Sequence, residues 1–226
     1  MHRVRRWVLR RRSRVPLTAD AIIATIDRAR FEQIRARHGV EDPRDEPPKY
    51  LEIEPWVNEN LRRIRAVELD LGRHKRVLDI GSGVGYFLYI SELLGHDSVG
   101  IDLDEMPMFN EMIELLDVQR QVWRVQPFVP LPDLGRFDLV TGFQICFNGH
   151  RSEQLWGLPE WDFFLDDLAS RLNPNGRIWL EFNREIDGTC FSPELETFFK
   201  RRGAEVISNR VIFNRVLPAP VEAARV

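Results

Sequence analysis

The sequence is poor in cysteine and has no long apolar run. Only two cysteines, Cys146 and Cys190, occur among the 226 residues, and their wide separation forms no metal-binding pattern. Such sparse use of cysteine is typical of a reducing cytoplasmic compartment rather than of a disulfide-rich secreted domain. No apolar segment has the length that crosses a bilayer, and the net charge of −3 lacks the basic excess of a general nucleic-acid binder. We therefore expect a cytoplasmic protein without a metal site and without DNA as a partner.

The amino-terminal arm lacks the apolar core of a secretion signal. Residues 1–14 include seven arginines, with Trp7, Val8 and Leu9 between them. One interpretation is a disordered basic tail. The other is a segment that lies on an anionic membrane surface, which would make the protein peripheral at the inner face of the membrane. The sequence leaves both interpretations open.

Length and composition suit one soluble domain with an appendage. Hydrophobic residues make up 43% and charged residues 30% of the chain, as in ordinary globular proteins. Residues 18–38 have the apolar spacing of a helix, and a charged linker that contains prolines follows at residues 41–49. We predict an amino-terminal extension at residues 1–49, formed by the basic arm and this helix, and a main domain at residues 50–226.

Three glycines stand on alternate positions directly after a buried strand. Residues 77–80 form the apolar strand, Gly81, Gly83 and Gly85 follow, and residues 86–94 have the apolar spacing of a helix. Glycines let the backbone approach a ligand closely, and the N–H groups at the start of the helix face such a ligand. Strand, glycine turn and helix together form a unit that cradles a nucleotide.

The local chemistry favours S-adenosylmethionine (SAM) over a dinucleotide. The dinucleotide fingerprint G-x-G-x-x-G would require a glycine where Tyr86 stands. Asp79, two residues before the first glycine, would repel a pyrophosphate but attract an ammonium group. SAM carries an ammonium and a sulfonium and has no phosphate.

The same stretch resembles motif I of the class I SAM-dependent methyltransferases, L-D-x-G-x-G-x-G. The residues that match it position by position are Leu78, Asp79, Gly81, Gly83 and Gly85. The resemblance covers most of the chain and implies an α/β fold. In that fold a doubly wound, mostly parallel seven-stranded sheet has helices on both faces, here with an N-terminal helical extension. It further implies that SAM is the cofactor, that S-adenosylhomocysteine (SAH) is the product, and that the glycine loop, Ser82 included, binds the cofactor.

A second predicted strand, residues 98–102, ends in an acid. Asp102 lies 21 residues after Gly81, which is the spacing at which a carboxylate on the neighbouring strand binds ribose hydroxyls. Two hydroxyl donors need an acceptor with two oxygens, which aspartate supplies. Leu103, directly after it, is expected to lie against the adenine.

The sequence departs from the family after the third predicted strand, residues 121–125. Many members carry an acid there that accepts a hydrogen bond from the adenine amino group, whereas this chain has Gln126. The side-chain carbonyl of Gln126, or a backbone group, offers the same acceptor chemistry. We therefore place Gln126 among the candidate cofactor-binding residues.

Residues 136–143 resemble the fourth strand of the family, and its "FDLV" element stands here at 137–140. The resemblance implies that Gly142 and Phe143 lie near the methionine end of SAM, with the acceptor loop after them. This stretch contains no Asn-Pro-Pro-Tyr and no Pro-Cys. Both amino-group methylation of nucleic acid and methylation of cytosine C5 are therefore disfavoured.

The remaining elements alternate between helices and strands. Helices are predicted at residues 56–71, 107–116, 159–172 and 193–202, a fifth strand at 177–183 after a turn at 173–176, and an antiparallel closing pair at 204–208 and 211–216. Alternation of this kind implies a mostly parallel sheet, in which ligands bind at the carboxyl ends of the strands. The aromatic residues of 159–172 are expected to lie in the core.

The predicted acceptor side follows the fourth and fifth strands. The candidate substrate-binding residues on this side are Gln144, Asn148 and Asn183. Tyr50, from the amino-terminal part of the chain, is a further candidate and is expected to cover the site. Methyl transfer is an in-line displacement that requires alignment of the reactants, and a hydroxyl acceptor benefits from a general base. His150 is the candidate base because the ordinary pKa of histidine suits that task; the alternative is a surface histidine without a catalytic role. Glu181 and Glu185, at the tip of the fifth strand, are competing candidates.

The leading hypothesis is a SAM-dependent methyltransferase that O-methylates a hydroxyl group of a small-molecule or glycan-type acceptor. One alternative is a SAM-binding regulator without catalysis. A nicotinamide-dependent oxidoreductase is disfavoured by Tyr86. A protein or RNA methyltransferase stays open, although no basic stretch interleaved with aromatic residues supports RNA.

Overall fold

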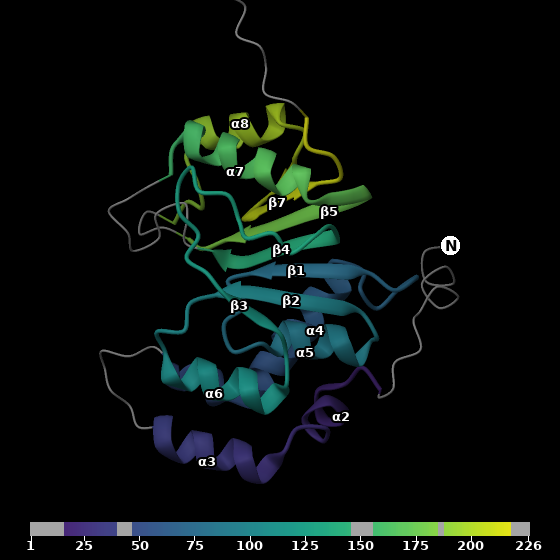
Figure 1. The fold of residues 1–226 in the computed structure, drawn as a ribbon, viewed down its shortest axis with the longest axis vertical. Helices are drawn as coiled ribbons and strands as arrows, with labels where there is room; N and C mark the ends of the chain where they lie inside the picture. Colours follow the sequence, from purple (N-terminus) through teal and green to yellow (C-terminus); the bar gives the residue numbers. More distant parts are fainter. Residues whose placement is uncertain (1–15, 40–46, 146–155, 185–187, 218–226) are drawn as a thin grey trace, which may run out of the picture. The chain divides into compact units, whose positions relative to one another are not determined.

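The structure of the protein, a computed structural model, describes residues 16–39, 47–145, 156–184 and 188–217. The chain divides into two compact units, Met1–Val122 (unit 1) and Trp123–Val226 (unit 2). Within both units helices alternate with strands along the chain (Figure 1). The predicted boundary between residues 49 and 50 stays a prediction.

The described strands form a seven-stranded sheet in the order β3-β2-β1-β4-β5-β7-β6. They are β1 (Arg76–Ile80), β2 (Asp97–Asp102) and β3 (Arg120–Val122) in unit 1, and β4 (Phe137–Ile145), β5 (Leu172–Phe182), β6 (Glu205–Ile207) and β7 (Arg210–Phe213) in unit 2. In unit 1, β2 pairs in parallel with both β1 and β3. In unit 2, β4 and β5 are parallel, whereas β7 runs antiparallel to β5 and β6. The predicted α/β fold with a mostly parallel seven-stranded sheet is confirmed.

The helices of unit 1 bury their apolar faces against one another and against the strands. The longer ones near the strands are α4 (Ile53–Ala66), α5 (Tyr86–Leu93) and α6 (Pro107–Leu116). On α4 the buried residues Val57, Leu61 and Ile64 follow the spacing of one helix face. This helix packs against α5, which in turn packs against β2. The helix α5, which begins where the glycine loop ends, therefore packs against both α4 and β2.

The prediction of a single helix at residues 18–38 is wrong. The chain instead forms α2 (Ala19–Ile23), a turn, and α3 (Arg28–His38). The hydroxyl of Thr25 donates to a carbonyl of α2 at 2.5 Å. The carboxylate of Asp27 accepts a hydrogen bond from an N–H of the first turn of α3 at 3.0 Å. Side-chain bonds of this kind compete with a continuous helix and start a new one.

Charge pairs link α3 to α6. The guanidinium of Arg30 lies 3.2 Å from the carboxylate of Glu114. His38 Nε2 lies 2.9 Å from Glu111 Oε1, and Arg37 pairs with the same carboxylate. The hydrogen bond from His38 makes the largest contribution to lowering the pKa of Glu111 below its ordinary value, and the hydrogen bond from Arg37 acts in the same direction. Because exposed pairs stabilise little, docking of α3 rests mainly on its two buried apolar side chains.

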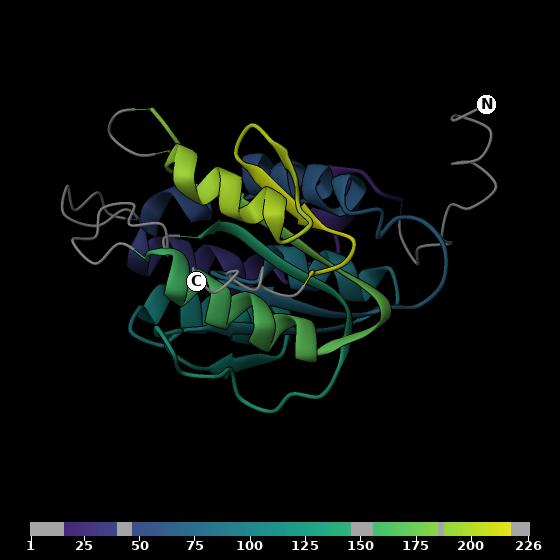
Figure 2. The ribbon, with the colours of Figure 1, turned by 90° about the horizontal axis from the view of Figure 1, so that it is seen from above.

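Unit 2 packs a pair of helices side by side over its strands (Figures 1 and 2). These are α7 (Leu158–Ser170) and α8 (Pro193–Arg201). Trp161 of α7 is fully buried, and its ring centroid lies 5.2 Å from that of Phe199 on α8 and 5.4 Å from that of Phe182 on β5. Aromatic pairs of this geometry contribute to a core beyond the area that they bury. The prediction that this helix supplies core aromatics is confirmed.

Three strands differ from their predicted bounds by three residues or more at one end. β7 covers Arg210–Phe213 rather than 211–216. β3 covers Arg120–Val122 rather than 121–125. β5 begins at Leu172, because residues 173–176 form an irregularity within the strand rather than a turn before it. Asn175 in this stretch has a φ of +66°, the left-handed conformation that asparagine tolerates better than most residues. The turn chemistry was recognised in the sequence, but its inclusion in the strand was not.

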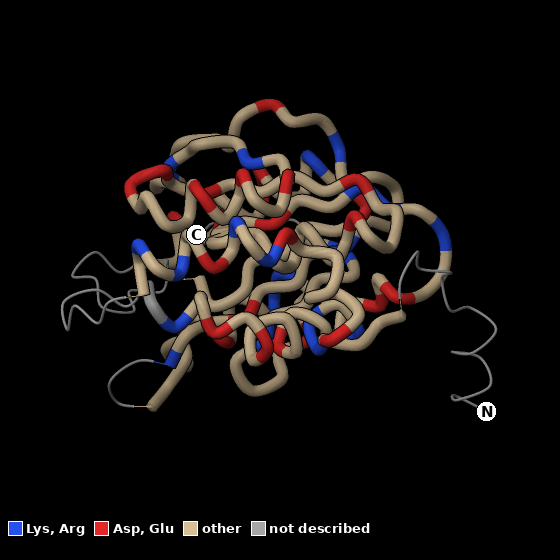
Figure 3. Tube along the Cα trace, turned by 90° about the horizontal axis from the view of Figure 1, so that it is seen from below, with Lys and Arg blue, Asp and Glu red and all other residues tan. Residues whose placement is uncertain are grey.

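In the described ranges, basic and acidic residues are mixed along the chain. Lys and Arg are interspersed with Asp and Glu along the described chain of each unit (Figure 3). Within the described ranges, every helix is too short or too polar to cross a bilayer. Residues 1–15 lie outside the described residues, so both interpretations of the basic arm stay open.

Candidate cofactor-binding site

The glycine loop joins the carboxyl end of β1 to the start of α5. The N–H of Gly81 donates to the carbonyl of Ile101 on β2 at 2.8 Å, and the N–H of Gly85 donates to the carbonyl of Ser82 at 3.0 Å. The φ angles of Gly81, Gly83 and Gly85 are +75°, +55° and +87°. Any other residue would be strained in this left-handed region. The alternate glycines of the sequence are therefore required by the backbone of the loop.

The third glycine is also required by packing. A Cβ on Gly85 would lie 2.8 Å from the side chain of Ile113 and 2.9 Å from that of Val118. Among the described residues, a Cβ on Gly83 would in contrast meet only Phe109, at 3.9 Å. Gly81 is exposed and Gly83 is half-buried. The last glycine thus serves the contact with α6, whereas the first two leave an open backbone surface for a ligand.

Asp102, the last residue of β2, lies against this loop. One carboxylate oxygen accepts a hydrogen bond from the N–H of Gly83 at 2.6 Å, and the other accepts one from the N–H of Leu103 at 2.8 Å. A carboxylate has about four lone-pair positions, so roughly two remain for other donors. The structure brings together the two features on which the sequence argument depends, the glycine loop and the acid 21 residues after Gly81.

Asp79 and Ser82 lie deeper than the open surface of the loop. Asp79 is 3% exposed and stands opposite Gly100 in the pairing of β1 with β2. The hydroxyl of Ser82 is buried and has no hydrogen-bond partner among the described residues. A Cβ on Gly100 would lie 2.4 Å from this hydroxyl. Ser82 therefore packs against β2, and Gly100 provides the space for it.

A short covering segment is tied to the loop. The 3-10 helix η1 (Pro47–Leu51) precedes α4, and the hydroxyl of Tyr86 donates to the carbonyl of Tyr50 at 3.2 Å. Burial raises the pKa of Tyr86, so the hydroxyl stays a donor. The ring of Tyr50 lies 5.4 Å, edge-on, from that of Phe109, the side chain nearest to Gly83. Tyr50 thus lies near the glycine loop; its roles in covering the cofactor and in contacting a substrate stay predictions.

Two residues that sequence reasoning missed organise the chain after Asp102. Arg120, at the start of β3, donates to the carbonyl of Leu103 at 3.1 Å and to the side-chain oxygen of Asn110 at 2.6 Å. Asn110, on α6, donates to the carbonyl of Asp104 at 2.8 Å. No spacing in the sequence signals this network, because its members come from three separate elements.

The predicted residues of unit 2 lie at the carboxyl ends of β4 and β5. Gly142 and Phe143 are buried within β4. Gln144 follows with a φ of +57°, at an irregularity in the pairing with β5, and its side chain is exposed. The side-chain nitrogen of Asn183 donates to the carbonyl of Gln144 at 2.7 Å. Two candidate substrate-binding residues are thus joined by a hydrogen bond.

Of the candidate bases, the structure describes Glu181. Glu181 is buried near the end of β5, and its Oε2 accepts a hydrogen bond from Arg210 Nε at 3.2 Å. The other two candidate bases, His150 and Glu185, lie outside the described residues, as does the candidate substrate-binding residue Asn148. Gln126, the candidate for adenine recognition, is described and has an exposed side chain after β3. Its role stays a prediction.

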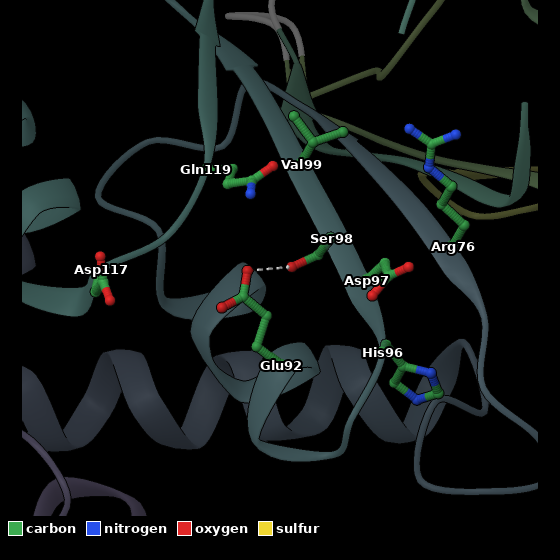
Figure 4. A pocket seen from close by; sticks show the side chains of 8 residues that line it. All are labelled: Arg76, Glu92, His96, Asp97, Ser98, Val99, Asp117 and Gln119. Atoms are coloured by element: carbon green, nitrogen blue, oxygen red, sulfur yellow. Dashed lines mark hydrogen bonds between the residues drawn. The ribbon is translucent and has the colours of Figure 1, made fainter. Parts of the chain in front are cut away.

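A separate hollow of about 620 Å³ lies at the amino ends of the unit 1 strands (Figure 4). Its lining includes Arg76, which begins β1, and the carboxylates of Glu92, Asp97 and Asp117. Ser98 donates to Glu92 at 3.0 Å, while burial raises the pKa of Glu92. Because the glycine loop follows the other end of β1, this hollow is distinct from the candidate cofactor site.

Comparison with solved structures identifies the architecture. DesVI of Streptomyces venezuelae is similar with a TM-score of 0.53 and 15% sequence identity over 73% of this chain and 92% of that chain. The fold is that of the class I SAM-dependent methyltransferases. No protein-family model and no curated protein sequence matches the chain. At these identities the likeness to class I methyltransferases concerns the fold alone.

Two further solved structures are similar at lower scores. The ribosomal protein L11 methylase of Lactobacillus delbrueckii subsp. bulgaricus has a TM-score of 0.45 and 15% identity, over 69% of this chain and 76% of that chain. CalS10 of Micromonospora echinaspora, described as an amino pentose methyltransferase, has a TM-score of 0.43 and 22% identity, over 59% of this chain. The match spans 53% of the length of CalS10.

Proposed function

We propose that the protein is a SAM-dependent methyltransferase. The observation that carries the proposal is the arrangement of Asp102 against the glycine loop within a class I methyltransferase fold. Two acceptor positions of its carboxylate remain for the two ribose hydroxyls, which is the interaction expected at the end of the second strand. The carboxylate also holds Gly83, so the ribose and the loop would share one anchor.

The residues present fit SAM better than a dinucleotide. Gly81 and Gly83 expose backbone to a ligand without a Cβ, and the buried carboxylate of Asp79 lies just before them. A negative charge there opposes a pyrophosphate and attracts the ammonium of SAM. The bound cofactor would supply a methyl group on a sulfonium centre. The task left to the protein is to bind the cofactor, exclude water and align the acceptor with that methyl group.

We further propose that the acceptor is a hydroxyl group of a small or glycan-type molecule. The described polar groups at the ends of β4 and β5 include the amides of Gln144 and Asn183. Neutral hydrogen-bonding groups suit a polyhydroxylated acceptor, whose hydroxyls each need a partner. Binding of SAM without production of SAH on any such acceptor would instead favour the regulator hypothesis.

The compartment that we propose is the cytoplasm. The basic arm, residues 1–15, would add weak contact with anionic lipid at the inner face of the membrane. Co-sedimentation of the full chain and of a chain without this arm with anionic vesicles tests that contact. If both chains bind the vesicles equally, the arm has no role in membrane contact.

The first expected result is selective binding of SAH. We expect SAH to raise the melting temperature of the full chain and to bind with a dissociation constant in the micromolar range, because a bound ligand stabilises the folded state by mass action. NAD, which carries a pyrophosphate, should leave the melting temperature unchanged. ATP serves as a control for adenine binding in the presence of phosphates. Stabilisation by NAD but not by SAH would overturn the proposed cofactor.

Asp102→Ala should weaken SAH binding by roughly 10- to 100-fold in isothermal titration calorimetry. The change removes the charge-assisted hydrogen bonds to the ribose, a loss of about 1.5–3 kcal/mol in total. It also removes the acceptor for Gly83. The matched control is Asp104→Ala, because Asp104 is an exposed aspartate in the same loop. Equal dissociation constants for the Asp102 variant and the parent protein would mean that the ribose is held elsewhere.

A further inference from the structure

We infer that Arg120 and Asn110 are positioning residues for the adenosine part of the cofactor, an inference that rests on the proposed function. Neither residue belongs to the glycine loop or to the acid at the end of β2. Both act on the segment between Asp102 and the start of α6, which has no regular secondary structure. The conformation of such a segment depends on the side chains that bind its backbone.

The network fixes three consecutive residues. Asp102 accepts the N–H of Leu103 at 2.8 Å, and Arg120 donates to the carbonyl of the same residue at 3.1 Å. The carbonyl of Asp104 accepts from Asn110 at 2.8 Å. Both peptide groups that flank Leu103 are therefore held, and the direction of its side chain follows from them. Leu103 is the residue predicted to lie against the adenine.

The guanidinium of Arg120 suits this task because of its shape. Its two terminal nitrogens reach different partners, with 3.1 Å to the carbonyl of Leu103 and 2.6 Å to the side-chain oxygen of Asn110. The planar group holds both at a fixed mutual distance, which the single ammonium of lysine would not do. Arg120 stands opposite Gly100 in the pairing of β3 with β2, so the bond reaches past the end of β2. The short β3 thus contributes to the site through the residue at its start.

Loss of this network should raise the entropic cost of binding without removing any atom that touches the cofactor. A segment that is mobile before binding must be ordered when the ligand arrives, and that cost appears as lower affinity. The effect should concern the adenosine part alone, because the network holds the residues next to the ribose and the adenine. SAH and 5′-methylthioadenosine, which lacks the amino acid part, should therefore be weakened by the same factor.

The test is calorimetry of the full-length protein with both ligands, at a temperature well below the melting point of each variant. We expect Arg120→Gln to weaken both SAH and 5′-methylthioadenosine by about tenfold, and Arg120→Lys to restore only part of the loss. Asn110→Ala should act in the same direction. If the two residues act as a unit, the double variant should bind no more weakly than Arg120→Gln alone.

The matched control is Arg30→Gln. Arg30 donates to Glu114, one helical turn beyond Asn110 on α6, so the variant removes an arginine contact to the same helix but not to the loop. Its dissociation constants should equal those of the parent. A lower melting temperature for Arg120→Gln with unchanged dissociation constants would overturn the inference and leave the proposed function intact. An equal loss in Arg30→Gln, or a loss confined to SAH, would also overturn it. A parent protein that binds neither ligand would remove the proposed function and this inference together.

Discussion

Asp162→Ala/Asp166→Ala is expected to lower the free energy of unfolding by about 3–5 kcal/mol, the cost of leaving a buried charge without its partners. Arg202, directly after α8, is fully buried. Its guanidinium pairs with Asp162 and Asp166 of α7, and its Nε donates to the carbonyl of Leu217 at 2.6 Å. The Arg202 side chain is itself 0% exposed, and without the two carboxylates its guanidinium would keep one carbonyl partner among the described residues. Urea denaturation of the full chain measures the change.

Replacement of the cation itself should cost less. In Arg202→Met no charge is left buried, and the side chain still fills much of the same space, so the loss should be smaller than in the double aspartate variant. Arg201→Met is the matched control, because Arg201 is exposed on the preceding position; it should stay within about 0.5 kcal/mol of the parent. A double aspartate variant that is as stable as the parent would show that water reaches the guanidinium.

The geometry of the glycine loop and of Asp102 could be predicted because its determinants are local. Gly81, Gly83 and Gly85 are needed for a backbone with positive φ angles, and a backbone requirement of this kind leaves a pattern in the sequence. Asp102 ends a strand whose neighbour is set by the parallel order of the sheet, so its spacing from the loop is also a sequence property. The hydrogen bond from Gly83 to Asp102 could not be predicted from this spacing and is seen only in the structure.

Long-range side-chain partners could not be predicted in this way. Arg120 and Arg202 look like ordinary surface arginines in the sequence, yet both are organised by partners on other elements. The break at Thr25 and Asp27 was missed for the opposite reason, since two short side-chain bonds outweighed a pattern of apolar spacing. Gln144 adopts a left-handed backbone that its residue type does not signal. That conformation is stabilised by the hydrogen bond from Asn183.

His150→Ala is expected to reduce turnover by about 10²- to 10⁴-fold, the usual contribution of a positioned general base. In the sequence His150 follows β4, at whose end Gln144 is joined to Asn183. Glu181 is a weaker candidate, because its carboxylate already accepts a hydrogen bond from Arg210 and is buried. The rate of SAH release measures turnover, with a hydroxyl acceptor that a screen by the same assay has identified. The dissociation constant of SAH should stay unchanged.

Two control variants show whether the loss of turnover in His150→Ala comes from removal of the general base or from a general effect of replacing a histidine. His74→Ala removes an exposed histidine before β1 and should leave turnover unchanged. Glu181→Gln keeps an acceptor for Arg210 but removes the charge, so it should fold and bind SAH as the parent does, with turnover reduced only if Glu181 takes the proton. Full turnover in His150→Ala would remove His150 from the mechanism. A loss in Glu181→Gln would then assign the base to Glu181, and full turnover in both variants would leave Glu185 as the remaining candidate.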